Sequence, residues 1–455
     1  MADTVHLEEG KILLEALLKH PEAFDHHHAN ELARILRQIY HEEGSEDFLQ
    51  YVLQIPEEYL GEILLELPEN LKDEALNALS VPKLIDVVDE LDSDDAVDLM
   101  QDIEEIDEAK EQEILSHLDE EDIEDIERLK NYEDDEAGSL MQTELFNAEL
   151  DETIADAVDR LRRLKMEGEL DNVYQVFIVD TFGFLIGGVS FEELITFDFE
   201  KKFRDYFEEG HKMIQSIHAT DSVDEVIKRF EDYDLVVLPV IDGRGKLIGR
   251  ITSDDIYDII EERATDQIYK MAGVNDEVEE DKDIKTITYK RATWLAVNLL
   301  TAILASIVIG WFDQTIQAYV ALAVLMPIVA SMGGNAGTQS LTIMVRQIAL
   351  GEQSWSEAKG AIRQEVIVSL FNGLIFAAAM GVIAMVWFED MRLGIVIALA
   401  MIINLLFAGF FGAIIPLGLK HVGIDPAVAS SVLLTTVTDV VGFFAFLGLA
   451  TVILV

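Results

Sequence analysis

The sequence predicts a multidomain membrane protein: an all-α superhelical N domain, a paired α/β domain, a connecting helix and a five-helix transmembrane domain. Three observations predict it: an apolar repeat every 12 residues, a second repeat every 62 residues, and long apolar segments near the C-terminus. Short repeats are typical of stacked units, and about 20 consecutive apolar residues can cross a bilayer. The expected limits of these parts are 1–130, 131–197, 198–253 (the two α/β halves), 254–290 and 291–455.

Charge is distributed unevenly along the chain. The 455 residues include 87 acidic and 33 basic side chains and no cysteine. Eight acids and six bases follow from Arg291 onward, which leaves a net charge of about −52 on residues 1–290. Such a surface repels nucleic acid and attracts cations. The first ten residues lack the basic and apolar regions of a secretory signal, so we expect the N-terminus in the cytosol.

The N domain is expected to consist of short stacked helices. The apolar residues that recur every 12 positions are Ile55, Leu67, Leu79, Leu91 and Ile103. Each is followed by a residue expected to start a helix, namely Pro56, Pro68, Ser80, Asp92 and Glu104. Proline in the first turn and Ser or Asp at the N-cap favour helix starts. The spacing therefore predicts a new helix at each of these five positions.

The second repeat predicts two copies of one α/β unit. Residues 176–180 return as 238–242, and residues 187–193 return as 249–255. Each copy is expected to form two strands joined by a turn, followed by a helix with a Ser or Thr cap. This pattern resembles a tandem pair of CBS domains, whose Gly-x-x-Thr-x-x-Asp pattern for a nucleotide ribose is matched by Thr252 and Asp255. A structural helix cap is the alternative role for these two residues.

The connecting helix carries a stripe of acids. Asp254, Asp258, Glu262 and Asp266 follow each other at i, i+4 spacing. Like charges at this spacing destabilise a helix by about 0.2–0.5 kcal/mol per pair. A cation bound on the stripe would offset the repulsion, and oxygen ligands without His or Cys suit Mg²⁺ or Ca²⁺. A solvated acidic face is the alternative, and residues 277–283 are expected to form an acidic linker.

Five apolar segments predict a multi-pass protein of the lipid bilayer. The expected spans are 292–312, 316–345, 361–388, 393–419 and 426–455. Basic residues precede span one (Arg291), lie between spans two and three (Arg346, Arg363), and precede span five (Lys420). The positive-inside rule then places the N-terminus in the cytosol and the C-terminus outside the plasma (inner) membrane.

Span two holds a cluster of neutral polar residues. Pro327 is expected to break the span, and residues 331–340 then combine paired glycines with Asn335, Thr338 and Gln339. Proline and glycine free backbone carbonyls, which lipid tolerates only where they face protein or a cavity. Close helix packing is the alternative, and it explains the glycines but not the polar side chains.

Span five holds Asp439, the only acid between Ala427 and Val455. A charged side chain in the bilayer is costly unless it faces protein or water and has a partner. Ser431, Thr435 and Asp439 lie on one helical face. We interpret the set Asn335, Ser431, Thr435, Asp439 and Gly442 as a cation path, with a helix-packing contact as the alternative. Mg²⁺ keeps much of its water and needs one or two carboxylates, which a two-fold dimer would supply.

Along its whole length the sequence resembles the MgtE family of magnesium channels and transporters. The specific motifs are Gly-Gly-Asn-Ala-Gly-Thr-Gln at residues 333–339 and Asp425-Pro426-Ala427 followed by Thr435-Thr436 and Asp439. The resemblance implies a homodimer whose pore is lined by spans two and five, with Asp439 as the pore aspartate. Members often have Asn-Pro where Ser431-Val432 stands here.

The resemblance also implies regulation by the transported ion. Cytosolic Mg²⁺ would bridge the acidic faces of the N domain, the CBS pair and the connecting helix and hold the pore shut. The candidate regulatory acids are Asp94, Asp98, Asp254, Asp255, Asp258, Glu262, Asp266 and Asp425. The expected function is Mg²⁺ import down its electrochemical gradient, with ATP or another adenine nucleotide as a possible ligand of the CBS pair.

Two other functions stay open on the sequence alone. One is a transporter of Co²⁺, Ni²⁺ or Ca²⁺ with a nucleotide-sensing CBS pair, and the other is a membrane-tethered cation sensor that conducts nothing. The chain contains no Gly-x4-Gly-Lys-Ser/Thr motif and no catalytic Ser, Cys or His constellation. Neither an ATP-driven pump nor an enzyme is therefore expected.

Overall fold

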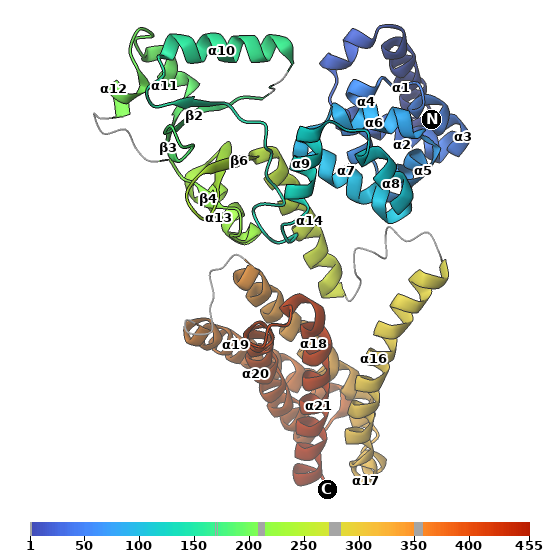
Figure 1. Cartoon of the computed structure of the whole chain (residues 1–455). Helices are drawn as coiled ribbons and strands as arrows, with labels where there is room; N and C mark the ends of the chain where they lie inside the picture. The colour runs from blue at the N-terminus through green and yellow to red at the C-terminus, as the bar shows by residue number, and fades with distance from the viewer. Residues whose placement is uncertain (1, 169, 171, 208–213, 273–283, 350–357) are drawn as a thin grey trace. The chain divides into compact units, whose positions relative to one another are not determined.

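The computed structural model describes residues 2–168, 170, 172–207, 214–272, 284–349 and 358–455. The chain divides into two compact units, Met1–Glu262 and Arg263–Val455. Figure 1 shows the helical N domain and the α/β domain of the first unit and the long helices of the second. The predicted fold class is confirmed. The predicted acidic linker, residues 277–283, lies outside the described residues.

The N domain is helical, as expected. Its elements are α1 (Ala2–Lys19), the 3₁₀ helix η1 (Pro21–His26), α2 (Ala29–Glu43), α3 (Ser45–Val52), α4 (Glu57–Leu65), α5 (Glu69–Ala78), α6 (Val81–Asp89), α7 (Ser93–Ile106), α8 (Glu108–Leu115) and α9 (Glu120–Leu129). Helices α4 to α7 each begin one residue after the predicted starting residue. Ile55, Leu67 and Leu79 are buried in the connections between these helices, whereas Ile103 is buried inside α7.

The fifth predicted helix start, at Glu104, is wrong. Glu104 lies inside α7, and the next helix begins at Glu108. Its N-cap is Asp107, whose side chain accepts hydrogen bonds from the N–H groups of Ala109 (3.0 Å) and Lys110 (3.3 Å). Glutamate is a good residue for a helix interior and a poor N-cap, so α7 continues to the first residue that can cap a new helix.

The α/β domain contains two similar sheets. Its strands are β1 (Asn147–Glu149), β2 (Gln175–Val179), β3 (Leu185–Ser190), β4 (Ile217–His218), β5 (Val237–Ile241) and β6 (Leu247–Thr252). Its helices are α10 (Ile154–Glu167), α11 (Phe191–Thr196), α12 (Phe203–Phe207), α13 (Val223–Tyr233) and α14 (Ser253–Ala272). The two predicted hairpins are β2–β3 and β5–β6, and each has a short parallel strand beside it, β1 or β4, that the repeat did not predict.

The segment that follows the N domain pairs with the second sheet. The N–H of Gln142 donates to the carbonyl of Arg250 at 2.8 Å, and the N–H of Arg250 donates back at 2.9 Å. The hydroxyl of Ser93, at the start of α7, donates to Glu144 Oε2 at 3.0 Å. These bonds hold the first turn of α7 next to the strand β6 that leads into α14.

The second unit is a bundle of membrane helices. Its elements are α16 (Ile284–Gly310), α17 (Asp313–Ala318), α18 (Ala321–Ala349), α19 (Ala358–Phe388), α20 (Met391–His421) and α21 (Pro426–Ile453). Five of these described helices are long and apolar enough to cross a membrane. Helices α18, α20 and α21 pack against one another, α19 packs mainly on α20, and α16 contacts α21. The second span begins at Ala321 rather than 316, because the short helix α17 occupies the preceding residues.

The predicted break at Pro327 is wrong, because α18 is a continuous helix through this residue. Proline lacks only the N–H that would bond to the carbonyl four residues earlier, that of Ala323. Membrane helices tolerate proline where neighbouring helices and polar side chains compensate the lost bond. The glycines that follow it serve close packing instead, as described below.

Candidate cation pathway and regulatory acids

Helix α21 presents a buried face and, beside it, a polar stripe. Ser430, Leu434, Thr438 and Gly442, spaced by four residues, are buried. Ser431, Thr435 and Asp439 each directly follow one of these buried residues in the sequence. They therefore lie about 100° around the helix from the buried face. Thr435 is exposed in the single chain, and Ser431 and Asp439 are partly exposed. The expected stripe therefore exists, whereas Gly442 belongs to the buried face.

Helix α18 carries a matching polar stripe. Ser331, Asn335, Thr338 and Thr342 recur on one face, and all four are exposed in the single chain. The Asn335 amide lies 3.4 Å from the Ser331 hydroxyl, and Thr338 donates to the carbonyl of Gly334 at 2.9 Å. Hydroxyl and amide groups of this kind can bond to the waters of a hydrated cation.

The two helices approach closely on their buried faces. A Cβ added at Gly337 of α18 would lie 3.0 Å from the Leu434 side chain of α21. Glycine therefore permits a contact that a larger residue would push apart. The polar stripes of α18 and α21 lie on surfaces of this packed pair that the single chain leaves at least partly exposed.

Asn404 of α20 is a buried polar residue that the sequence analysis did not select. Its side chain is 0% exposed, and its Nδ2 donates to the carbonyl of Val329 in α18 at 2.7 Å. Cβ atoms added at Gly333 or Gly442 would lie within 3 Å of the same amide nitrogen. A lone amide in an otherwise apolar span was the available signal.

We call Met1–Glu262 the cytosolic unit, after the expected position of the N-terminus, and Arg263–Val455 the membrane unit. In the cytosolic unit, one of the two regulatory acids predicted on α7 lies near one of those predicted on α14. Asp94 and its neighbour Asp95 lie near Asp255, close enough for the three charges to influence one another. Asp94 is 9% exposed, and within the described residues its Oδ1 has no hydrogen-bond partner. Asp98, one turn further along α7, is exposed. We call Asp94, Asp95 and Asp255 the acid cluster.

Protons bind the acid cluster more tightly than they bind ordinary carboxylates. Burial raises the pKa of Asp95 to about 7, with the charges of Asp255 and Asp92 adding to the effect. Burial and the charge of Asp95 raise the pKa of Asp94 well above its usual range. Burial raises the pKa of Asp255 too, although its bond with Thr252 opposes the shift. An uncompensated negative charge is therefore costly here, and a bound cation would relieve it.

In the membrane unit, Lys270 bridges two other predicted regulatory acids. Its ammonium group contacts Asp266, one turn earlier on α14, and lies 3.2 Å from Asp425 Oδ2. Asp425 also caps α21, because its Oδ1 accepts the N–H of Ala427 at 2.8 Å. Next to these charges, Met271 packs against an apolar cluster from α18, α20 and α21. The end of α14 is thus attached to the start of α21 through a cation that belongs to the protein.

The remaining stripe acids, Asp254, Asp258 and Glu262, are exposed on α14. Partial burial and the charges of Glu261 and Asp254 raise the pKa of Asp258. Within the described ranges, no three carboxylate or imidazole side chains converge into a preformed metal site. The structure thus divides the predicted regulatory acids among the acid cluster, the Lys270 bridge, this exposed stripe and the exposed Asp98.

Thr252 and Asp255 form a helix-capping arrangement. The Thr252 hydroxyl donates to Asp255 Oδ2 at 2.7 Å, and the Thr252 N–H reaches the same oxygen at 3.3 Å. Thr252 is 2% exposed at the end of β6. A residue at the start of a helix and an acid three positions later commonly bond in this way.

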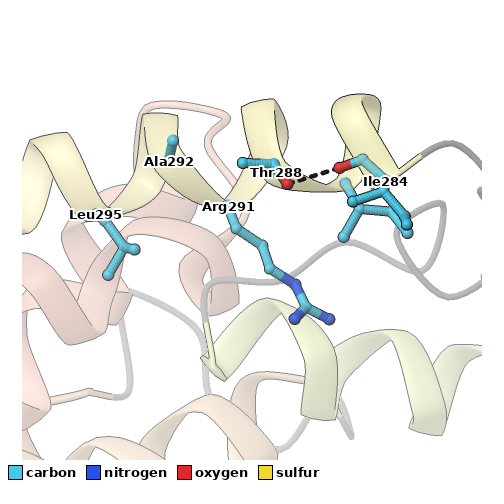
Figure 2. Close-up of a pocket in the computed structure, with 6 residues that line it drawn as sticks. Ile284, Thr288, Arg291, Ala292 and Leu295 are labelled. Atoms are coloured by element: carbon cyan, nitrogen blue, oxygen red, sulfur yellow. Dashed lines mark hydrogen bonds between the residues drawn. The ribbon is translucent and has the colours of Figure 1, made fainter.

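Figure 2 shows a cavity of about 410 Å³ beside α16. It is lined by Ile284, Ile287, Thr288, Arg291, Ala292 and Leu295. Arg291 supplies a cationic group, and the Thr288 hydroxyl is bonded to its own helix at the Ile284 carbonyl. All six residues belong to a single helix, so this cavity brings no polar groups together from different elements.

Comparisons with known proteins agree with this architecture. A divalent cation transporter model of the MgtE family matches residues 326–449, the MgtE intracellular N domain matches 27–135, and a CBS domain matches 211–262. The magnesium transporter MgtE of Thermus thermophilus is 31% identical over 328 residues, which cover 72% of each chain. That of Enterococcus faecalis is 30% identical over 323 residues, covering 71% of this chain and 70% of its own.

Two solved structures are also similar. The soluble part of a magnesium transporter is 26% identical, with a TM-score of 0.49, over 57% of this chain and 99% of the other. The ATP-bound cytosolic domain of the Mg²⁺ channel MgtE is 28% identical, with a TM-score of 0.45, over 52% and 98%.

An acidic helical N domain, a CBS pair and five membrane helices, of which α18 and α21 carry polar stripes, define a multi-pass transporter of divalent cations rather than an enzyme. The chain belongs to the MgtE family of magnesium transporters.

Proposed function

We propose that the protein is a Mg²⁺-selective channel that imports Mg²⁺ down its electrochemical gradient. The observation that carries the proposal is the stripe of Ser431, Thr435 and Asp439 on α21, a helix that packs against α18, which has its own polar stripe containing Asn335. Neutral oxygens leading to a carboxylate can hold an ion that keeps its water. Gly442 lies on the buried face of α21, so the proposed pathway does not include it.

A homodimer would complete such a pathway. One chain supplies one membrane carboxylate, and a two-fold axis beside α21 would bring two copies of Asp439 together. We place the N-terminus in the cytosol and the C-terminus outside the plasma membrane, as the basic residues near the span ends indicate. The domain limits at residues 130, 197, 253 and 290 are part of the same proposal.

Regulation would follow from the acids of the cytosolic unit. A divalent cation at the acid cluster would neutralise Asp94 and Asp255 and favour contact between the N domain and the CBS pair. Asp98 and the exposed stripe of Asp254, Asp258 and Glu262 would provide further positions for hydrated ions. A cation that binds the closed arrangement more tightly shifts the population toward it, so high cytosolic Mg²⁺ would close the pore.

The experiment that tests conduction compares the wild type with Asp439→Ala in liposomes. With internal Mg²⁺ kept low, we expect the wild type to take up Mg²⁺ and the variant to lose at least about 90% of this rate, equivalent to about 1.4 kcal/mol. Undiminished uptake in a correctly folded variant would contradict the assignment of Asp439.

The same liposomes separate the two competing functions. A transporter of another divalent cation would carry Co²⁺, Ni²⁺ or Ca²⁺ without competition from Mg²⁺. A sensor that conducts nothing would show no uptake in either protein and no effect of Asp439→Ala.

Nucleotide binding at the CBS pair is a separate proposal. Thr252 and Asp255 match the ribose pattern, but a ribose would have to replace their mutual hydrogen bond. Calorimetric titration of the full-length protein with ATP tests this proposal. Saturable ATP binding that Asp255→Asn weakens would support a nucleotide site. If the wild type binds no ATP and Asp255→Asn only lowers the thermal stability, Thr252 and Asp255 form a helix cap and nothing more.

A further inference from the structure

Asn404 is a buried amide whose hydrogen-bonding capacity is only partly used. It lies in α20, one of the helices long and apolar enough to cross a membrane, and is 0% exposed. Its Nδ2 donates to the carbonyl of Val329, but within the described part of the chain its Oδ1 has no hydrogen-bond partner. An unsatisfied buried acceptor destabilises a protein, so stability alone would favour an apolar residue at this position.

The Asn404 amide fills a space between glycines of two other helices. A Cβ added at Gly333 of α18 would lie 2.3 Å from Nδ2, and one added at Gly442 of α21 would lie 2.9 Å from it. Real Cβ atoms essentially never approach this closely, so a side chain at either position would require the amide to shift. One side chain of α20 thus contacts both helices that carry the polar stripes.

These contacts lie at the depth of the proposed pore residues. Gly333 precedes Asn335 by two residues, and Gly442 follows Asp439 by three. At about 1.5 Å of rise per residue, each glycine is within one turn of its pore residue. A change in the size or bonding of the amide would therefore move Asn335 and Asp439 relative to each other.

We propose that Asn404 is a positioning residue that fixes the separation of α18 and α21 and thereby favours Mg²⁺ over the larger Ca²⁺. The inference rests on the proposed function. Mg²⁺ requires near-octahedral oxygen geometry at about 2.0–2.1 Å, whereas Ca²⁺ accepts six to eight oxygens at about 2.3–2.6 Å. A rigid spacing between the polar stripes that fits Mg²⁺ would exclude the larger Ca²⁺. A loose spacing would let Ca²⁺ bind as well, because Ca²⁺ accepts variable geometry.

The test measures the ratio of initial Mg²⁺ and Ca²⁺ uptake rates in liposomes. Asn404→Leu keeps a similar volume and removes the donor to Val329. We expect this ratio to fall about fivefold or more, a difference of about 1 kcal/mol. Leu405→Met is the matched control, because it changes a neighbouring buried residue of α20 at constant volume and should leave the ratio unchanged.

Gly333→Ala provides a second, independent variant. Asn404 is unchanged in this variant, but the added methyl group would displace its side-chain amide. The ratio of Mg²⁺ to Ca²⁺ uptake should therefore fall, as in Asn404→Leu. A wild-type ratio in both variants would overturn the inference, as would failure of both to fold, which would indicate a purely structural residue.

Asp439→Ala in the same liposomes separates the two proposals: if it conducts like the wild type, the proposed pore is wrong. If it does not conduct and the Asn404 variants keep the wild-type ratio, only the role of Asn404 is wrong.

Discussion

At the scale of single residues, the environment of each acid decides what it can do. Asp439 lies on α21 next to the buried face of this helix and is partly exposed in the single chain. Asp94 and Asp95 instead lie at a protein contact in the cytosolic unit, where burial and neighbouring acids disfavour their charge. We therefore propose different roles for the same residue type: Asp439 is a ligand of the ion pathway, whereas Asp94 and Asp95 form a contact that depends on bound cations.

The raised pKa of Asp95 makes a prediction about pH. Its pKa is about 7 in the folded protein, whereas an exposed aspartate has a pKa near 3.9. Between about pH 4 and pH 7 the folded state therefore binds more protons than the unfolded state, and stability falls as the pH rises. For the full-length protein without divalent cations, we expect the melting temperature to decrease from pH 5 to pH 8, and less so for Asp95→Asn.

Thermal unfolding in chelator across this pH range is the measurement. Asp232→Asn, which changes an exposed acid of α13, is the control and should keep the wild-type slope. Equal slopes for wild type and Asp95→Asn would show that this carboxyl does not bind the extra proton.

At the scale of elements, α14 carries the connection between cytosolic and membrane parts. Its acids at residues 254, 258 and 262 are exposed, but at its far end Lys270 compensates Asp266 and reaches Asp425 at the start of α21. The hydrogen bond to Asp266 raises the pKa of Lys270, so this amine stays charged. The built-in cation holds α14 on α21 without any metal.

The Lys270 bridge predicts a shift in Mg²⁺ inhibition. Lys270→Met would leave Asp266 and Asp425 without their shared cation, so closure would depend more strongly on bound Mg²⁺. We expect the Mg²⁺ concentration for half-inhibition of uptake to rise about three- to tenfold, equivalent to about 0.6–1.4 kcal/mol. The measurement is liposome uptake over a series of internal Mg²⁺ concentrations.

Lys270→Arg keeps the positive charge and serves as the control, with inhibition close to that of the wild type. If Lys270→Met and Lys270→Arg behave alike, the bridge does not contribute to closure.

At the scale of the whole molecule, charge is the dominant feature. A net charge of about −52 on residues 1–290 makes close association of the cytosolic elements unfavourable unless cations accumulate there. Monovalent salt screens charges over a Debye length of about 8 Å at physiological ionic strength, but it does not bridge neighbouring carboxylates. Divalent cations can do both.

This difference predicts an ion-specific change in the protein. Mg²⁺ should slow proteolysis of the full-length protein in detergent, whereas Na⁺ at equal ionic strength should have much less effect. The triple variant Asp254→Asn, Asp258→Asn and Glu262→Gln should lose part of this protection and remain open at high Mg²⁺. Unchanged Mg²⁺ inhibition in the triple variant would exclude the exposed stripe as a sensor.

Local patterns were sufficient for most of the fold. The 12-residue repeat predicted the starts of α4 to α7, the 62-residue repeat predicted the two hairpins, and apolar length predicted five membrane spans. These features depend on neighbouring residues along the chain, which a sequence displays directly. The errors at Glu104 and Pro327 arose because helix ends depend on capping and packing as well as on a single residue type.

The sequence by itself determined the fold class, the family and the polar stripe that ends at Asp439. Only the tertiary structure showed that Asp94 and Asp95 meet Asp255, that Lys270 joins Asp266 to Asp425, and that Asn404 lies between Gly333 and Gly442. The physical reason is the same in each case. Burial and pairing depend on which residues the fold brings together from distant parts of the chain, and no local spacing encodes those distances.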